Sequence, residues 1–335
     1  MTLNKRITSS FPIGQCKSSK LQIYVLSSRK GEASLNKFNG VLAPVITPFT
    51  EDLLPDEDRL IAHCQWLISQ GVGLAVFGTN SEANSLSTEE KLVLLDGLVN
   101  HGIDPALMMP GTGGCALSDT VRLTAHAVAL GCGGTLMLPP FYYKDVPDDG
   151  LFAFYSEVIQ RVAEESLRIY LYNIPPVSQI PISLGLIERL VTTYPDTIAG
   201  IKDSSGEWSN TAALNELAID DFRVFCGSES FLLQNMQFGG AGCISATANV
   251  NPSPIKDLYD NWQSEDAGQR QAKLNEIRQI FQSLPMIPAL KTATSIYSGD
   301  SKWLRVRPPL LPLTTDQQAS LQDQLESVGF EMPGL

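Results

Sequence analysis

The stretch 168-RIYLYNIPPVSQIPISLGLIERLVTTYPDTIAGIKDSSG-206 decides the fold class of this 335-residue chain. It contains an apolar run at 168–175, an amphipathic stretch at 183–191 and a second apolar run at 198–202. Neither run alternates polar and apolar residues, which is typical of parallel strands that are covered on both faces. The stretch therefore predicts one strand–helix–strand unit of an α/β protein.

The same unit recurs along the chain from Gly40 onward. The apolar runs stand at 41–47, 72–78, 106–111, 133–139, 168–175, 198–202, 223–227 and 242–246. Helical patterns separate them, at 56–69, 92–98 (behind a capping box at 87–90), 118–130, 148–163, 183–191, 208–217 and 230–238. Eight such repeats in about 210 residues favour a (β/α)8 TIM barrel over a doubly wound sheet.

The chain divides into three predicted segments: an N-terminal extension at 1–37, the barrel at 38–252 and a C-terminal helical region at 253–335. The extension is rich in Ser and holds seven Lys or Arg against one acidic residue, and it lacks the compact apolar core of a secretory signal. We expect it to be mobile and the protein to be cytoplasmic, with a mitochondrial transit peptide as the alternative.

Composition narrows the classes of partner. The net charge of −12 disfavours nucleic acid and anionic membranes, and no apolar run is long enough to span a bilayer. The six cysteines are scattered and form no CxxC pair, so we interpret them as reduced thiols. The three histidines form no HExxH or HxH motif and fall in helical patterns, so no metal site is expected.

Lys202 is the leading candidate for catalysis because it ends the sixth apolar run, and function in such barrels lies at the carboxyl ends of the strands. Burying an ammonium there is costly unless it is paired, whereas a neutral amine can attack a carbonyl to form a Schiff base. The alternative is a lysine that extends to a neighbouring carboxylate.

Two further strand ends carry chemistry. Tyr172 ends the fifth run, where its hydroxyl could move protons; the alternative is a half-buried aromatic with a satisfied hydroxyl. Thr79 and Asn80 lie in 78-GTNSEANSLS-87, whose backbone N–H groups and side chains suit a ketoacid carboxylate; the alternative is an ordinary helix-entry turn. We expect Glu82 in this loop to be buried and hydrogen-bonded to backbone.

Nucleotide and phosphate sites are disfavoured. The motif 111-GTGGCA-116 fits a dinucleotide fingerprint, but the next predicted strand ends at 138-LPP-140 without the required acidic residue. The chain has no Walker A motif, and the acidic segment 228-SES-230 disfavours a phosphate site after the seventh strand.

Six motifs, taken in order, resemble those of the dihydrodipicolinate synthase/N-acetylneuraminate lyase superfamily: 78-GTNSEANSLS-87, 111-GTGG-114, 139-PPFYY-143, 172-YNIP-175, 200-GIKDSSG-206 and 239-GGAGCISATANV-250. The resemblance runs from about residue 38 to residue 329 and excludes the extension. It implies a class I mechanism in which a lysine forms a Schiff base with a 2-ketoacid such as pyruvate, without a cofactor. It also implies a homotetramer built from dimers.

The resemblance implies a role for each matching residue. Lys202 would form the imine, and Tyr172 would relay protons to and from the substrate. Thr79 would be the hydroxyl residue of that relay, and Asn80 its neighbour in carboxylate binding. Tyr142 matches a tyrosine that is lent across a dimer interface, and Ile244 matches the position whose backbone helps bind the ketoacid.

Val177 is a departure from the lysine-biosynthetic members of the superfamily. Those members carry an arginine at this position, which pairs with the carboxylate of the second substrate. A valine cannot make that pair, so dihydrodipicolinate synthesis is disfavoured.

The expected reaction is the cleavage of a 2-keto-4-hydroxy acid to pyruvate and an aldehyde. The substrate would be of the 4-hydroxy-2-oxoglutarate or 2-keto-3-deoxy sugar acid type. A related sugar acid dehydratase, dihydrodipicolinate synthase and a barrel that binds a ketoacid without turnover are the alternatives. Specificity is expected from Val177, Ser178, Ser204, Ser205 and Ser228.

Overall fold

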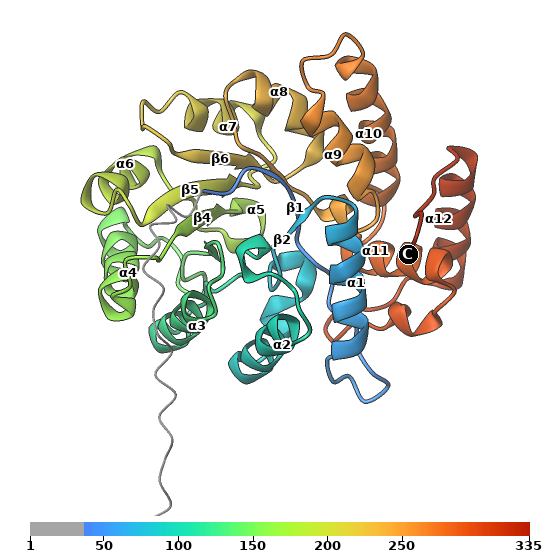
Figure 1. Cartoon of the computed structure of the whole chain (residues 1–335), viewed down its shortest axis with the longest axis horizontal. Helices are drawn as coiled ribbons and strands as arrows, with labels where there is room; N and C mark the ends of the chain where they lie inside the picture. Colours follow the sequence, from blue (N-terminus) through green and yellow to red (C-terminus); the bar gives the residue numbers. More distant parts are fainter. Residues whose placement is uncertain (1–36) are drawn as a thin grey trace, which may run out of the picture. The chain divides into compact units, whose positions relative to one another are not determined.

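Seven parallel strands form the sheet of residues 37–335, the part of the chain that the computed structural model describes (Figure 1). They are β1 (Gly40–Ala43), β2 (Gly73–Leu74), β3 (Thr135–Met137), β4 (Ile169–Asn173), β5 (Ile198–Asp203), β6 (Arg223–Cys226) and β7 (Gly242–Ile244). Their order in the sheet is β2-β1-β7-β6-β5-β4-β3. The predicted extension at 1–37 lies, except for Lys37, outside the described residues.

The segment Met108–Gly111 completes the barrel, but it does so through single bridges. Met108 bridges to Leu74 of β2 and Gly111 to Leu136 of β3, both in parallel. The prediction of a regular strand at 106–111 is therefore wrong, because Pro110 has no N–H to donate toward β3. Its carbonyl still accepts a hydrogen bond from the Leu136 amide at 2.9 Å. The predicted (β/α)8 architecture is confirmed.

Helices separate the strands and continue beyond them. They are α1 (Glu57–Ser69), α2 (Thr88–Asn100), α3 (Leu117–Ala129), α4 (Asp148–Val162), α5 (Pro175–Ser178), α6 (Leu184–Thr193), α7 (Trp208–Asn215), α8 (Leu232–Gln237), α9 (Pro252–Asp260), α10 (Ala267–Gln282), α11 (Met286–Ser298) and α12 (Thr315–Ser327). Short 3-10 helices include η1 (Thr79–Ser81), η4 (Glu229–Phe231) and η5 (Ala246–Asn249). The predicted capping box is present at the start of α2, where the side chains of Ser87 and Glu90 each accept a hydrogen bond from the backbone N–H of the other residue.

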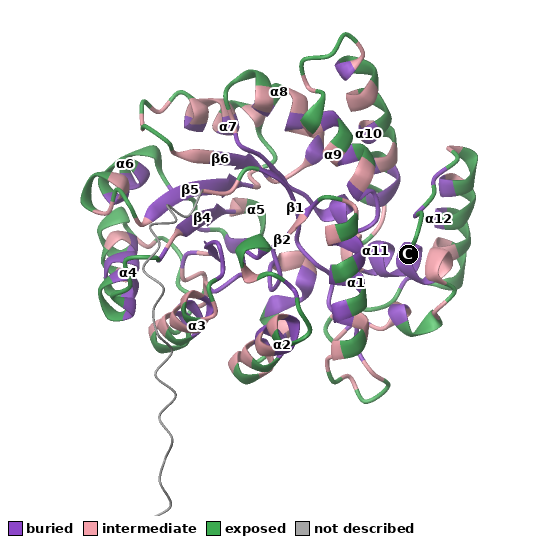
Figure 2. Cartoon of the chain, in the orientation of Figure 1, coloured by how far each residue is buried: buried purple, intermediate pink, exposed green. Residues whose placement is uncertain are grey.

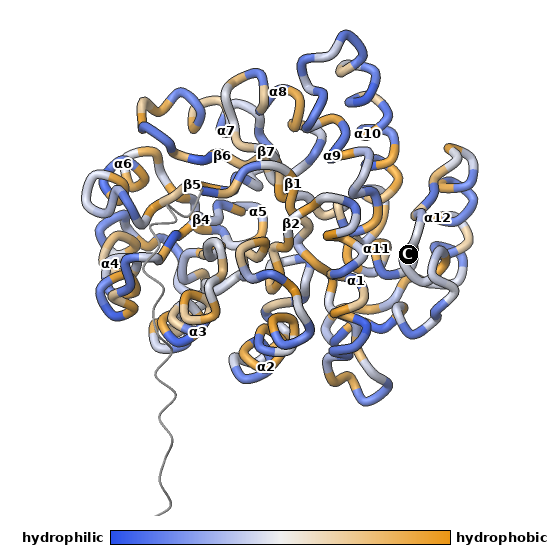
Figure 3. The backbone as a smooth tube through the Cα atoms, viewed as in Figure 1, coloured by the Kyte–Doolittle hydropathy of each residue, from blue (hydrophilic) through white to orange (hydrophobic). Residues whose placement is uncertain are grey.

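Two apolar layers hold the barrel together. The interior is filled by residues from every strand except β2, from Ala75 just after β2 and from the Met108–Gly111 segment, in a cluster that includes Leu42, Met109, Leu136, Tyr170 and Phe225. Larger clusters pack between the outer face of the sheet and the helices. The buried and hydrophobic residues accordingly follow the strands and the helix faces turned toward them (Figures 2 and 3). None of the helices described combines the length and apolar character needed to cross a membrane.

A buried ion pair connects the loop after β2 to α11. Lys291 and Glu82 are both buried and form a salt bridge. Lys291 Nζ also donates to the Arg305 carbonyl at 2.7 Å, and Glu82 Oε2 accepts from the Arg307 amide at 2.8 Å. Burial lowers the pKa of Lys291 to about 8. The prediction that Glu82 is buried and bonded to backbone is confirmed, and its carboxylate fixes the loop that carries Thr79 and Asn80.

We expect Lys291→Met to lower the free energy of unfolding by about 3–5 kcal/mol, because Glu82 is left buried without its counter-charge. Urea unfolding at pH 7 measures this change. The double variant Glu82→Gln/Lys291→Met leaves no unpaired charge and should recover part of the loss. Lys256→Met is the matched control, since it breaks a partly exposed pair with Asp260 on α9 and should cost less than about 1 kcal/mol. Equal losses for Lys291→Met and Lys256→Met would contradict the anchoring role of the buried pair.

Candidate active site

Lys202 lies at the carboxyl end of β5, in register with Tyr172 of β4 and Phe225 of β6. Residues paired directly across neighbouring strands point to the same face, and Tyr172 and Phe225 belong to the interior cluster. The Lys202 side chain therefore also points into the barrel, where it is 2% exposed. Its Nζ lies 4.3 Å from the centroid of the Tyr172 ring.

The amine of Lys202 has no ion-pair or hydrogen-bond partner within residues 37–335. Asp203, the neighbouring carboxylate, points to the opposite face of β5. It accepts hydrogen bonds from Asn173 Nδ2 at 2.9 Å, from Thr211 Oγ1 at 2.6 Å and from Ser205 Oγ at 2.9 Å. The alternative of a lysine paired with a nearby carboxylate thus finds no support in the described residues, and the strand end beneath Lys202 is held rigidly by Asp203.

Thr79 and Tyr172 meet although 93 residues separate them. Thr79 Oγ1 lies 3.1 Å from Tyr172 Oη, and either oxygen can donate the hydrogen bond. Thr79 begins η1, whose last residue is held in place by a hydrogen bond from Thr47 Oγ1 to the Ser81 carbonyl at 2.7 Å. The tyrosine hydroxyl is therefore connected to a fixed hydroxyl group, while the ring that carries it lies against the lysine amine.

A cavity of about 750 Å³ contains these groups. It opens at the carboxyl ends of the strands and is lined by Lys202, Tyr172, Thr79 and Asn80. The remaining lining residues come from the segments after β4, β5, β6 and β7, from the end of α10 and the start of α11, and from Leu310. The volume is adequate for a small organic acid. Four predicted site residues, from three separate parts of the sequence, therefore share one cavity.

Tyr142 and Ile244 lie elsewhere in the described chain. Tyr142 is in the loop between β3 and α4, is 73% exposed and packs edge-on against Tyr143. It does not line the cavity of its own chain, so its role across a dimer interface stays a prediction. Ile244 ends β7 and is fully buried in the interior cluster. Its backbone contact with a ketoacid also stays a prediction.

The five predicted specificity residues divide into two groups. Val177, Ser204 and Ser228 line the cavity. Ser178 and Ser205 do not, because their hydroxyls are used in local turns: Ser178 Oγ donates to the Ile174 carbonyl at 3.0 Å, and Ser205 Oγ bonds Asp203. For these two serines the prediction is wrong.

A buried ion pair in the cavity wall is absent from the sequence-based predictions. Glu229 follows β6 and is completely buried, and its carboxylate accepts hydrogen bonds from Ser245, Thr247 and Arg278 Nη1, the last at 3.2 Å. Its charge is paired inside the protein, so it does not repel anions as the acidic segment 228–230 suggested. The available signal was periodicity: Arg278 lies on the buried face of α10 with Leu274 and Phe281, where an apolar residue is expected.

The histidines play no part in this cavity. His63 packs between Trp66 and Trp303, and burial lowers its pKa to about 4. His126 bonds Asp96 at 2.7 Å, and His101 caps α2. The histidines thus serve packing and surface roles. Within residues 37–335 no group of three or more His, Cys, Asp or Glu is arranged to hold a metal ion.

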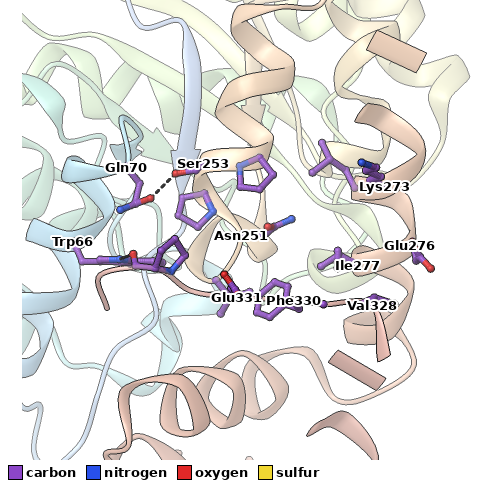
Figure 4. A pocket seen from close by; sticks show the side chains of 16 residues that line it. Trp66, Gln70, Asn251, Ser253, Lys273, Glu276, Ile277, Val328, Phe330 and Glu331 are labelled. Carbon is purple, nitrogen blue, oxygen red and sulfur yellow. Dashed lines mark hydrogen bonds between the residues drawn. The ribbon is translucent and has the colours of Figure 1, made fainter. Parts of the chain in front are cut away.

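A second cavity, of about 470 Å³, lies between α1, α9, α10 and the C-terminal segment (Figure 4). Figure 4 shows Trp66 and Gln70 on one side, Phe330 and Glu331 on another, and a hydrogen bond between Ser253 and Gln70. This cavity shares no lining residue with the cavity around Lys202. The Lys202 cavity at the strand ends is therefore the candidate active site.

Known proteins are similar to this chain in both sequence and fold. Residues 37–328 match the model of the dihydrodipicolinate synthetase family. The 4-hydroxy-tetrahydrodipicolinate synthase of Methanococcoides burtonii is 32% identical, over 87% of this chain and 99% of its own. A crystal structure of dihydrodipicolinate synthase from Agrobacterium tumefaciens superposes with a TM-score of 0.80 at 30% identity, over 86% of this chain and 99% of that one.

A second solved structure holds a ligand. It is YagE from E. coli K12, a prophage protein of the dihydrodipicolinic acid synthase family, in complex with pyruvate. It superposes with a TM-score of 0.79 at 28% identity, over 88% of this chain and 99% of that one. The resemblance drawn from the six motifs is thereby confirmed over residues 37–328. The chain belongs to the dihydrodipicolinate synthetase family and is a class I carbon–carbon lyase of that family.

Proposed function

We propose that the protein is a Schiff-base aldolase that cleaves a 2-keto-4-hydroxy acid to pyruvate and an aldehyde. The substrate is of the 4-hydroxy-2-oxoglutarate or 2-keto-3-deoxy sugar acid type. One observation carries the proposal. A buried lysine, without an ion-pair partner among residues 37–335, lies with its amine 4.3 Å from the ring of a tyrosine in the same cavity, and the hydroxyl of that tyrosine is hydrogen-bonded to Thr79. The relative from E. coli that holds pyruvate supports a ketoacid as the ligand.

The residues suggest a complete cycle. The amine of Lys202 attacks C2 of the substrate, and the carbonyl oxygen leaves as water with a proton from the Tyr172 hydroxyl, which gives a protonated imine and an ionised Tyr172. The ionised Tyr172 accepts the proton of the C4 hydroxyl while the C3–C4 bond breaks, and the bonding electrons pass into the imine to give an enamine. The aldehyde departs, and C3 regains a proton from Tyr172. Hydrolysis then releases pyruvate, restores the amine and returns a proton to Tyr172.

The loop that begins η1 orients the substrate. The side chains of Thr79 and Asn80 line the cavity beside Tyr172 and can bind the carboxylate next to the ketone. Holding this carboxylate places C2 within reach of the lysine, which lowers the entropic part of the barrier. Thr79 also keeps the Tyr172 hydroxyl pointed toward the cavity and provides a path for its proton.

Two alternatives use the same imine. A sugar acid dehydratase would eliminate water without breaking the C3–C4 bond, and its product would retain all carbons. Dihydrodipicolinate synthesis remains disfavoured because Val177, which is 61% exposed on the cavity wall, places an apolar group where a carboxylate partner would be needed. The proposal includes a homotetramer in which Tyr142 reaches a second chain, and a cytoplasmic or mitochondrial location.

Borohydride reduction in the presence of pyruvate tests the imine. We expect one covalent adduct, on Lys202, detected by peptide mass spectrometry of the intact full-length protein. Lys202→Arg should give no adduct. Lys291 is a second buried lysine in the same protein and serves as an internal control, since it is paired with Glu82 and should stay unmodified. A folded protein that gives no adduct on Lys202 would refute the proposed mechanism.

Tyr172→Phe tests the proton relay. We expect kcat for aldol cleavage to fall about 10²- to 10⁴-fold, because the C4 hydroxyl loses its proton acceptor. Tyr170→Phe is the matched control: it removes a hydroxyl from the same strand, and that hydroxyl accepts a hydrogen bond from the Phe38 amide at 2.7 Å, outside the cavity. It should leave kcat unchanged. Steady-state rates of pyruvate release decide between the outcomes, and equal rates for both variants would exclude Tyr172 from the chemistry.

A further inference from the structure

We propose that Arg278 binds a carboxylate at the far end of the substrate, so that the enzyme prefers a dicarboxylic 2-keto-4-hydroxy acid to one that ends in neutral hydroxyls. The inference rests on the proposed aldolase function and specifies its substrate class. Arg278 comes from α10, outside the strands, and lines the same cavity as Lys202.

The charges of the cavity wall single out Arg278. Among the residues that line the cavity, Lys202 and Arg278 are the only cations and Asp203 is the only carboxylate. Lys202 is occupied by the imine during turnover. Asp203 is saturated by Asn173, Ser205 and Thr211 and points away from the interior of the barrel. Arg278 is therefore the one lining cation that remains for a second anionic group.

The hydrogen bonds of Arg278 leave its Nη2 group unused. Nη1 donates to Glu229 Oε2 and to Ser245 Oγ, each at 3.2 Å. Nε is buried without a hydrogen-bond partner, so a ligand in the cavity does not reach it. No described residue accepts from Nη2, and the residue as a whole is 9% exposed. Nη2 is therefore the donor that a carboxylate in the cavity can meet, through a charge-assisted hydrogen bond.

Glu229 positions Arg278 through Nη1 and leaves Nη2 unoccupied. Its two oxygens also accept hydrogen bonds from the hydroxyls of Thr247 and Ser245, so the carboxylate is held in place by the segment that follows β7. The pair is buried, with Glu229 almost completely and Arg278 nine-tenths enclosed. The guanidinium is therefore oriented before a ligand arrives, which reduces the entropy lost on binding.

The rest of the wall does not distinguish an acid from a polyol. Ser204, Ser228, Ser230 and Gln282 line the cavity with neutral polar groups that can bond a hydroxyl or a carboxylate. Val177 offers no polar group at all. The preference for an anionic end thus depends on Arg278, and a hydrogen bond to a charged group is strong enough to shift specificity about 10- to 100-fold.

The test compares kcat/KM for 4-hydroxy-2-oxoglutarate, which ends in a carboxylate, with that for 2-keto-3-deoxygluconate, which ends in hydroxyls. We expect the wild-type protein to prefer the first, and Arg278→Gln to reduce that preference about 10- to 100-fold, mainly through KM. Arg270→Gln is the matched control, because Arg270 lies on the same helix but pairs with Asp257 and Asp266 outside the cavity. It should keep the wild-type preference.

Additional measurements keep the outcomes distinct. Arg278→Gln leaves Glu229 buried and unpaired, so thermal unfolding of each variant checks the fold, and Glu229→Gln/Arg278→Gln removes both charges if the single variant is unstable. Borohydride trapping with pyruvate on Lys202 reports the proposed function independently. Two results would overturn the role of Arg278 while leaving the aldolase proposal intact, provided that pyruvate is trapped on Lys202. One is a wild-type protein that does not prefer the dicarboxylic acid. The other is an equal preference in the Arg278→Gln and Arg270→Gln variants. No trapping in the wild-type protein overturns both proposals.

Discussion

The site depends on the parallel register of β4 and β5, which places Tyr172 directly beside Lys202. Because paired residues share a face, the lysine enters the barrel together with the tyrosine, while Asn173 and Asp203 turn outward together and bond each other. A shift of β5 by one residue would turn Lys202 out of the barrel and Asp203 into its interior. The hydrogen bonds that Asp203 accepts on the outer face of β5 therefore help to maintain the register that places Lys202 beside Tyr172 inside the barrel.

Two other buried cations of the described chain are paired with carboxylates, whereas the Lys202 amine has no such partner among residues 37–335. The pair Glu82–Lys291 fixes the loop of Thr79, and the pair Glu229–Arg278 fixes the part of the cavity wall that follows β6. Both pairs connect a segment at a strand end to a helix of the C-terminal region. That region is thus part of the active site, since α10 and α11 supply the basic partner of each pair.

Local sequence patterns predicted the barrel well because each strand–helix unit carries its own signals. Apolar runs without alternation, N-cap residues and helical periodicity all act over fewer than about 20 residues. The failure at 106–111 has an equally local cause: Pro110 removes a donor, so the segment closes the barrel through bridges and not through a ladder. Ser178 and Ser205 were misassigned because a short hydroxyl side chain readily bonds its own turn.

The sequence by itself determined that Lys202, Tyr172, Thr79 and Asn80 lie in one site, because the carboxyl ends of parallel strands must meet at one end of a barrel. Only the tertiary structure decided which charges are neutralised. Glu229 and Arg278 are 49 residues apart, and Glu82 and Lys291 are 209 apart, so no local pattern relates them. Whether a buried charge is neutralised by a partner or available to a ligand depends on the atoms that surround it. Those atoms come from distant parts of the chain.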